Sequence, residues 1–135
     1  MLLLDTNIVS AVRRPDRHPE VARWLAAEQS EALFLSVVTI GEIRRGITRQ
    51  ERRDPPFAHE LTVWLTQLLT QFGDRVLSFD LPEAQRWGRL SAELGHDTPD
   101  LMIAATALER GFTVVTRNVK DFELTGVETF DPSEG

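Results

Sequence analysis

The amino-acid sequence predicts an α/β fold in the form of a three-layer α/β/α sandwich, with a central, mostly parallel sheet of about four or five strands. Two observations lead to this prediction. Short apolar runs of strand length alternate along the chain with longer segments whose apolar residues recur at helical spacing, and this alternation is typical of parallel sheets whose strands are joined by helices. The chain has 135 residues, of which 41% are hydrophobic, which is enough for one core and leaves little room for another. We therefore expect a single domain over residues 1–135.

The first half of the chain is expected to form two strands and four helices. They run in the order strand 2–4, helix 6–12, helix 19–29, strand 33–35, helix 38–52 and helix 57–72. The first strand is an apolar run that cap and turn residues follow at once. Pro15 limits the first helix, and Asp54-Pro55-Pro56 separates the last two, because a proline disfavours helical geometry at the residue before it.

The second half continues the alternation. It is expected to contain strand 76–79, a helix between Pro82 and Gly95, helix 99–110, strand 113–116 and a short strand over 127–130. Thr98 and Pro99 are suited to the N-cap and first position of the helix that Gly111 closes. Apart from Asp100 in its first turn, the N-terminal part of this helix has almost no polar face. We expect it to be buried on most sides, against the sheet.

Composition excludes several classes of protein. Acidic residues outnumber basic ones 21 to 15, giving a net charge of −6, so a basic surface over the whole domain is absent, although a local basic patch is compatible with these totals. The absence of cysteine excludes disulfides, thiolate metal sites and a cysteine nucleophile. No apolar run approaches the ~20 residues of a membrane helix, and the N-terminus lacks the basic region of a signal peptide. We expect a cytoplasmic protein that does not associate with membranes.

Acidic side chains follow several of the predicted strands or open the helices beside them. Asp5 comes directly after the first strand, Glu42 lies early in the helix after the second, and Asp100 opens the helix that precedes the strand 113–116. Asn118 and Asp121 follow that strand. Ligands of open parallel sheets bind at the carboxyl ends of the strands, so three or four carboxylates are expected to share one pocket.

Carboxylates gathered in one pocket need a counter-charge. With no cysteine, and with His18, His59 and His96 expected outside the cluster, the ligands would all be oxygens, which suits Mg²⁺ or Mn²⁺. Such an ion orients water, lowers the pKa of that water and neutralises a phosphodiester in the transition state. The pattern therefore indicates metal-assisted phosphodiester hydrolysis.

Four blocks of sequence resemble those of PIN-domain ribonucleases, and more narrowly the VapC-type toxins of bacterial toxin–antitoxin pairs. The blocks are LLLDTN at 2–7, TIGEIRRG at 39–46, DLMIAATA at 100–107 and TRNVKDF at 116–122. Each is weakly specific alone, but they occur in the order of the family and span nearly the whole chain.

The resemblance implies a small PIN-like α/β/α sandwich and a Mg²⁺-dependent endoribonuclease, and the oxygen ligands predicted above would also accept Mn²⁺ as a substitute. It implies Asp5, Glu42, Asp100 and Asp121 as the catalytic acids, and Asp5 and Asp100 as the metal ligands. It also implies a homodimer that acts as the toxin of a type II toxin–antitoxin system, with RNA as substrate and a cognate antitoxin as inhibitor. Asp97, three residues before Asp100, is an additional acid that either joins the site or lies in solvent.

Each of these acids also has a structural interpretation. Asp5 is a good N-cap for the first helix, and Glu42 is placed to form a helix-surface ion pair with Arg45. Asp100 suits the first turn of a helix, and Asp121 suits a turn after a strand. Thr116 is a candidate for orienting another polar group or simply ends its strand.

Basic residues cluster on the predicted helix 38–52. Arg45 and Arg49 flank Glu42 at helical spacing, and together with Asn118 they are the candidates for contacts with the substrate, because an acidic protein that binds RNA must supply local cations. A solvated face is the alternative. Arg13, Arg14 and Arg17 form a second, looser cluster.

Two other functions compete with the nuclease. The first is a module that keeps the PIN fold and binds RNA or a protein without cleaving anything. The second is a phosphatase that uses Asp5 as its nucleophile. Such a site usually has a second acid and a lysine nearby, whereas here Asn7 stands where that acid would be and the single lysine is Lys120.

Overall fold

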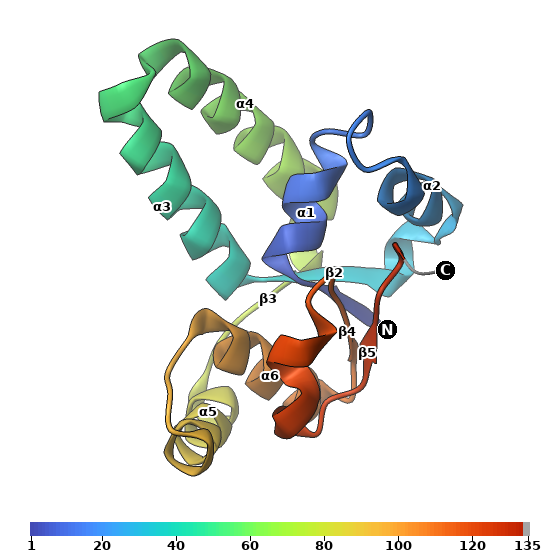
Figure 1. The fold of residues 1–135 in the computed structure, drawn as a ribbon, viewed down its shortest axis with the longest axis vertical. Helices are drawn as coiled ribbons and strands as arrows, with labels where there is room; N and C mark the ends of the chain where they lie inside the picture. The colour runs from blue at the N-terminus through green and yellow to red at the C-terminus, as the bar shows by residue number, and fades with distance from the viewer. Residues whose placement is uncertain (134–135) are drawn as a thin grey trace.

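Five parallel strands form the centre of residues 1–133, the part of the chain that a computed structural model describes (Figure 1). The strands are β1 (Leu2–Leu4), β2 (Leu33–Ser36), β3 (Val76–Leu77), β4 (Thr113–Val115) and β5 (Thr129–Phe130). They lie in the order β3-β2-β1-β4-β5 and all neighbouring pairs are parallel. β1, the first strand in the sequence, is the central strand, and Leu3 pairs with Phe34 on one side and Val114 on the other. The predicted parallel sheet is confirmed.

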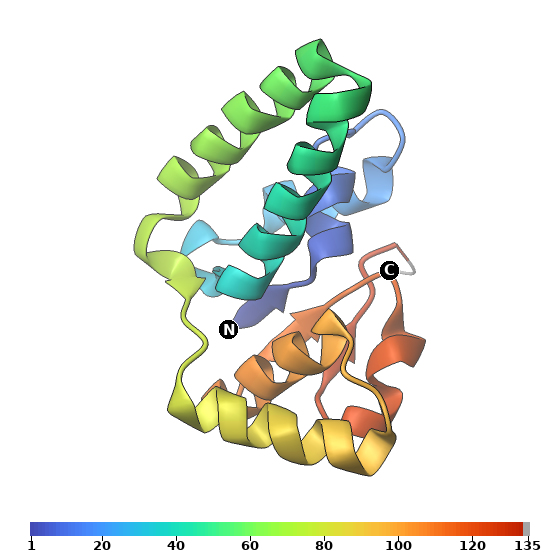
Figure 2. The same ribbon diagram turned by 90° about the vertical axis from the view of Figure 1, so that its left-hand side faces the viewer.

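Helices cover both faces of this sheet, which confirms the three layers. The helices are α1 (Thr6–Val12), α2 (Pro19–Ala27), α3 (Val37–Arg53), α4 (Pro55–Phe72), α5 (Leu81–Leu94) and α6 (Pro99–Arg110). The first four lie on one face and the last two on the other, together with a 3₁₀ segment, Val119–Thr125 (Figures 1 and 2). α3 and α4 form a hairpin that projects away from the sheet.

The two faces of the sheet bury two separate hydrophobic cores. Leu4 and Val115 contribute to the core under α1–α4, whereas Leu3 and Val114 contribute to the core under α5 and α6. Successive side chains of a strand point to opposite faces, so the uninterrupted apolar runs of β1 and β4 serve both cores. α6 is buried along most of its length, as its composition predicts.

Four boundaries differ from the predicted ones by two residues. One of them is the start of β5, which lies at Thr129 instead of residue 127. α4 begins at Pro55 instead of residue 57, because a helix tolerates proline in its first turn, where the backbone N–H has no helical partner. Asp54 ends α3 and its side chain accepts a hydrogen bond from the backbone N–H of Phe57 in α4. α2 ends at Ala27, and a 3₁₀ turn follows at Ser30–Ala32. β3 stops at Leu77, since Ser78 and Asp80 already belong to the cap of α5.

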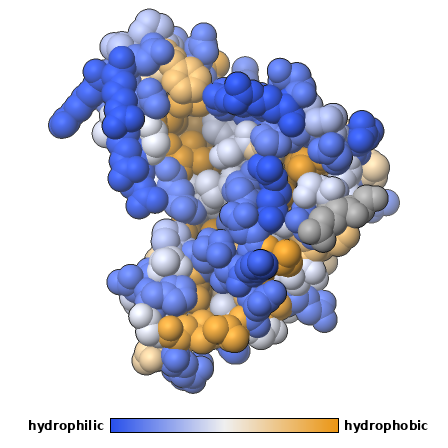
Figure 3. Space-filling view, in the orientation of Figure 1, coloured by the Kyte–Doolittle hydropathy of each residue, from blue (hydrophilic) through white to orange (hydrophobic). Residues whose placement is uncertain are grey.

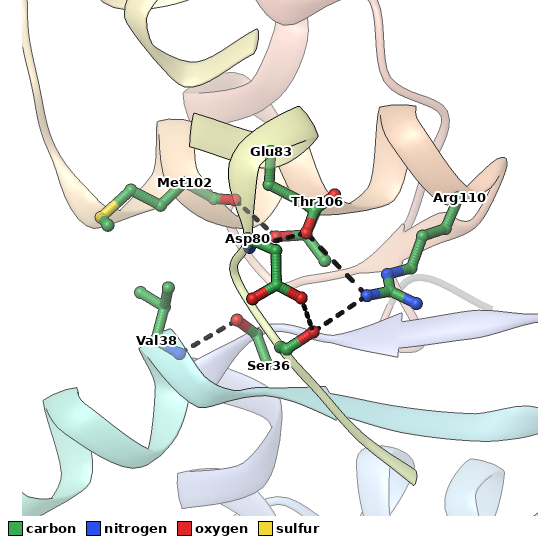
Figure 4. A network of polar contacts seen from close by, with 8 residues as sticks. Ser36, Val38, Asp80, Glu83, Met102, Thr106 and Arg110 are labelled. Atoms are coloured by element: carbon green, nitrogen blue, oxygen red, sulfur yellow. Dashed lines mark hydrogen bonds and ion pairs between the residues drawn. The ribbon is translucent and has the colours of Figure 1, made fainter. Parts of the chain in front are cut away.

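A polar network joins α5 to α6 beneath the sheet (Figure 4). Glu83 is 5% exposed and accepts a hydrogen bond of 2.8 Å from the backbone N–H of Asp80, which forms one half of a capping box. A guanidinium nitrogen of Arg110, at the end of α6, lies 3.9 Å from the Glu83 carboxylate. The buried charge of Glu83 is therefore balanced within the chain.

Candidate active site

A cavity of about 540 Å³ opens at the carboxyl ends of β1 and β4. Its lining includes the acidic residues Asp5, Glu42, Asp100 and Asp121. These four acids come from the end of β1, from α3, from the start of α6 and from the 3₁₀ segment after β4. The fold thus brings together the carboxylates that are far apart in the sequence, at the predicted edge of the sheet.

Asp5 is the most buried of these acids, with 4% of its surface exposed. Its backbone N–H donates to the carbonyl of Val115 at 2.9 Å, which continues the pairing of β1 with β4. One carboxylate oxygen accepts a hydrogen bond of 2.8 Å from the backbone N–H of Thr6, so Asp5 is also the N-cap of α1. The structural and functional interpretations of Asp5 are therefore compatible.

Thr116 is the centre of the hydrogen bonds around Asp5. Its side chain is fully buried, and its hydroxyl donates to the second carboxylate oxygen of Asp5 at 2.8 Å. The same hydroxyl oxygen accepts from the side-chain amide of Asn7 at 3.2 Å and from the backbone N–H of Asn118 at 3.0 Å. Asn7 in turn accepts from the backbone N–H of Arg117. Thr116 therefore ties the residues after β1 to the loop after β4.

Glu42 is held by a hydrogen bond from α1. The hydroxyl of Thr6 donates to the Glu42 carboxylate at 2.6 Å and lies 3.1 Å from the hydroxyl of the buried Thr39. Arg45 lies 3.9 Å from the other carboxylate oxygen, but its side chain is 56% exposed. A solvent-exposed pair of this kind contributes little to stability. The position of Glu42 is therefore fixed from the side of α1.

Asp100 and Asp121 complete the acidic lining. Asp100 is half-buried in the first turn of α6. Asp121 is exposed, and its backbone N–H donates to the carbonyl of Asn118 in the turn that starts the 3₁₀ segment. Asp97 is exposed and does not line the cavity.

Burial and mutual repulsion raise the pKa values of two of these acids. Burial raises the pKa of Asp5 to about 6; the negative charges of Asp100 and Glu42 raise it as well, while the hydrogen bonds from Thr116 and Thr6 lower it. Burial also raises the pKa of Asp100; Asp121 and Glu42 raise it further, and His96 lowers it. Within residues 1–133, no basic side chain forms an ion pair with Asp5 or Asp100. Asp5 and Asp100 therefore lie close to other acids without an ion-paired cation in the described part of the chain.

The donor set fits a hard divalent cation. All the acidic ligands offer oxygen, and Mg²⁺ is usually held by one or two carboxylates while it keeps several waters. The described side chains do not form a group of three or more His, Cys, Asp or Glu donors around one point, so an ion bound here would take one or two carboxylates from the chain and keep several waters.

The predicted substrate-binding residues lie at different distances from the cavity. Asn118 is part of its lining, Arg45 contacts Glu42 at its margin, and Arg49 is not among the lining residues. Three arginines that the sequence interpretation did not assign to the site line it instead: Arg13, Arg14 and Arg117. Their places in the sequence could have indicated this. Arg13 and Arg14 follow the helix that Asp5 caps, and Arg117 lies between Thr116 and Asn118.

The expectation that the histidines lie outside the cluster is wrong for His18, which lines the cavity. His96 is exposed and does not line this cavity, although its charge lowers the pKa of the Asp100 carboxyl. Both residues precede a helix in loops whose course the sequence does not specify.

No helix within residues 1–133 has the length and apolar composition needed to cross a membrane.

The family follows from the comparison of the whole chain with known proteins. A family model described as the PIN domain matches residues 2–127. The chain belongs to the PIN-domain family. PIN-domain nucleases of the VapC type generally depend on divalent metal ions, which agrees with the four carboxylates that line this cavity.

Relatives of this PIN domain cover nearly its entire length. The plasmid stability protein StbB of Pseudomonas syringae pv. tomato is 37% identical over 99% of both chains, and the VapC ribonuclease Y4jK of Sinorhizobium fredii is 32% identical over 99% of both. Among solved structures, the crystal structure of FitAcB from Neisseria gonorrhoeae superimposes with a TM-score of 0.86, at 33% identity and over 98% of each chain. The α/β/α arrangement is therefore that of a PIN domain with solved relatives.

Proposed function

We propose that this protein is a Mg²⁺-dependent endoribonuclease that acts in the cytoplasm as the toxin of a type II toxin–antitoxin system, with residues 1–135 forming one PIN domain. The observation that carries the proposal is the cavity in which a buried carboxylate, Asp5, lies near further acids and has no basic partner among residues 1–133. Membership of the PIN-domain family supports it. Relatives called VapC ribonuclease and toxin FitB support the activity and the biological context.

Asp5 and Asp100 are the proposed metal ligands, and Glu42 and Asp121 complete the site directly or through water. Bound Mg²⁺, or Mn²⁺ in its place, would supply charge neutralisation at the scissile phosphate and a water of lowered pKa. The protein's own contribution is preorganisation: Thr116 and the Thr6 N–H fix the Asp5 carboxylate, and the Thr6 hydroxyl fixes Glu42.

The proposed substrate is RNA, because cationic and amide groups are available at the same cavity. Arg45, Arg49 and Asn118 remain the proposed contacts, and Arg13, Arg14 and Arg117 join them because they line the cavity itself. Phosphate contacts of this kind position a nucleic acid without reading its sequence.

The proposed partners are a cognate antitoxin and a second copy of the chain. A structure of FitAB bound to a DNA fragment superimposes on this chain with a TM-score of 0.82 at 30% identity, and one of DNA-bound VapBC from Salmonella typhimurium with 0.74 at 25%. These complexes support an antitoxin partner for this chain as well.

Cleavage of RNA by the purified protein tests the proposal. We expect single-stranded RNA to be cut in Mg²⁺, cutting to stop with EDTA and to resume when Mg²⁺ is restored, and the Asp100→Asn variant to be inactive. Binding of RNA with no cutting in any divalent metal would favour a PIN-fold binding module. Formation of an aspartyl-phosphate on Asp5 with a phosphoryl donor, detected by mass spectrometry, would favour a phosphatase, since a nuclease in which water attacks the phosphorus forms no such intermediate.

A further inference from the structure

A second cavity lies beside the acidic one, where α1, α3 and α4 meet. Its volume is about 290 Å³. Its walls on α3 and α4 are mainly apolar or aromatic and consist of Ile43, Ile47, Phe57, Leu61 and Trp64, with Gln50 as a polar member. In the space-filling view, a hollowed strip with apolar side chains runs beside α3, and hydrophilic side chains border it on both sides (Figure 3). We refer to this cavity as the α3–α4 groove.

The α3–α4 groove is continuous with the acidic cavity. Residues that line both are Thr6, Ser10, Arg13, Arg14 and Glu42. A polymer that places one group among the carboxylates therefore has an adjoining apolar recess available for the next group along its chain.

Arg13 lies at the junction of the two cavities and is held against an aromatic ring. Its guanidinium carbon is 5.3 Å from the centroid of the Phe57 ring, within the range of a cation–π contact. A guanidinium so placed offers several N–H donors to a phosphate. The junction thus combines a phosphate-binding group with an aromatic face.

Gly46 leaves the wall of the groove open. It is in the interior of α3, where glycine costs about 1 kcal/mol relative to alanine. A Cβ atom added at this position would meet no heavy atom within 4 Å, so packing inside the described chain does not require glycine there. The missing side chain leaves space in a groove that borders the acidic cavity.

We propose that the α3–α4 groove is a nucleobase subsite, in which the base of the nucleotide next to the scissile phosphate stacks on Phe57 or Trp64. Arg13 and Arg14 bind the phosphate of that nucleotide, and Gln50 is the hydrogen-bonding group available to the edge of the base. The inference rests on the proposed function. It specifies the substrate as single-stranded RNA, because a base must be unpaired before it can stack on a protein side chain.

The size of the groove suits a single base. Its volume of about 290 Å³ is at the lower end of small-ligand sites. Continuity with the acidic cavity and the arginines at the junction give the site the charge that a nucleotide requires.

The test combines a protein variant that fills the groove with an RNA that lacks the base. Gly46→Leu adds a side chain in the groove, and the Cβ atom of that side chain would meet no heavy atom within 4 Å. The matched control is Gly88→Leu, because Gly88 is also inside a helix, also has open surroundings and lies on α5, on the other face of the sheet. Each full-length protein cleaves a single-stranded oligonucleotide of fixed sequence, and versions of it with an abasic site or another base on either side of the cut.

We expect the abasic site on one side of the cut to lower kcat/KM for the wild type by at least about fivefold, the scale of base–aromatic stacking. Gly46→Leu should lower kcat/KM for the intact RNA by a similar factor, and should no longer distinguish intact, abasic and base-substituted RNA. Gly88→Leu should behave as the wild type, and both variants should keep the wild-type melting temperature or exceed it.

Independent, multiplicative losses from Gly46→Leu and from the abasic site would overturn the proposal, because the two changes would then act at different places. So would a Gly46→Leu protein that escapes inhibition by its antitoxin while its base preference is unchanged. If the wild type cuts no RNA, the proposed function fails, and the same comparison is made by fluorescence anisotropy of bound oligonucleotide. In that case, an abasic penalty that Gly46→Leu removes would support the subsite on its own, and its absence would overturn it.

Discussion

Asp5 and Glu83 are buried to nearly the same extent in opposite layers of this protein, at 4% and 5% exposure, yet their surroundings differ. Glu83 has Arg110 at 3.9 Å and closes a capping box with Asp80 (Figure 4). Within residues 1–133, the Asp5 carboxylate accepts hydrogen bonds from two neutral donors, the hydroxyl of Thr116 and a backbone N–H, and forms no ion pair, and Asp100 and Glu42 raise its pKa.

The difference supports the proposed roles, with Glu83 as a structural carboxylate and Asp5 as a ligand of an external cation. A buried charge is costly unless it is paired and hydrogen-bonded. Arg110 provides the counter-charge for Glu83 inside the chain, whereas Asp5 forms no ion pair within residues 1–133, and in the proposed function a proton or a bound ion supplies its counter-charge. The burial of Asp5 without a paired cation raises its pKa to about 6, so its carboxyl binds a proton more tightly than an exposed one.

The largest expected effect distinguishes the two carboxylates by activity. Asp5→Asn should lower kcat/KM for RNA by about a thousandfold or more, since it removes a metal ligand and with it several kcal/mol of transition-state stabilisation. Glu83→Gln should cleave at nearly the wild-type rate, because glutamine retains the capping-box hydrogen bond. Steady-state cleavage assays measure both. Wild-type activity in Asp5→Asn would remove Asp5 from the mechanism.

The second prediction concerns the stability of the metal-free protein as the pH changes. The folded-state pKa of Asp5 is raised from 3.8 to about 6, so the folded state holds this proton more tightly than the unfolded state. The contribution of Asp5 to stability therefore decreases as the pH rises from about 4 to about 6, by at most about 3 kcal/mol, and stays low above that range. Denaturant titrations of the wild type and Asp5→Asn across this range isolate the effect by difference.

Adding Mg²⁺ should reverse this loss. Because the ion binds the ionised carboxylate, we expect it to raise the melting temperature of the wild type more at pH 7 than at pH 5, and to have little effect on Asp5→Asn. Equal stabilisation of both proteins at both pH values would show that the ion binds elsewhere.

The third prediction tests whether the neutral donors around Asp5 orient it. Thr116→Val should lower the cleavage rate by about 10–100-fold, the range found when an outer partner of a metal ligand is removed. It should also raise the pKa of Asp5 further, because the Thr116 hydrogen bond lowers that pKa. NMR titration of the carboxyl and cleavage assays measure the two effects. Thr116→Ser is the control: it keeps the hydroxyl and should retain most of the activity.

The smallest effect is expected at Glu83, the buried carboxylate that has Arg110 as its counter-charge. Arg110→Met should reduce the free energy of unfolding by about 1–2 kcal/mol, because it leaves Glu83 buried with no cation, and should leave RNA cleavage unchanged. The double variant with Glu83→Gln should recover part of the loss in a double-mutant cycle. A cost below about 0.5 kcal/mol, typical of surface positions, would show that the pair at 3.9 Å contributes little.

The sequence by itself determined the fold class and most of the acidic site. Alternation of apolar runs with helical segments predicts the parallel sheet, because strands buried on both faces, such as Leu2–Leu4 and Thr113–Val115, are continuously apolar. The sequence also predicts that Asp5 and Asp100 share this pocket, because a carboxylate directly after a strand or in the first turn of a helix is a local feature of the chain.

Only the tertiary structure decided how these groups are arranged and compensated. The hydroxyl of Thr116 reaches Asp5 across 111 positions, and the hydroxyl of Thr6 reaches Glu42 across 36. The placement of Arg13, Arg117 and His18 in the cavity, and the pairing of Glu83 with Arg110, likewise depend on how layers and loops pack. Periodicity and capping act over a few residues, whereas hydrogen bonds and counter-charges depend on distances in space that chain closure sets.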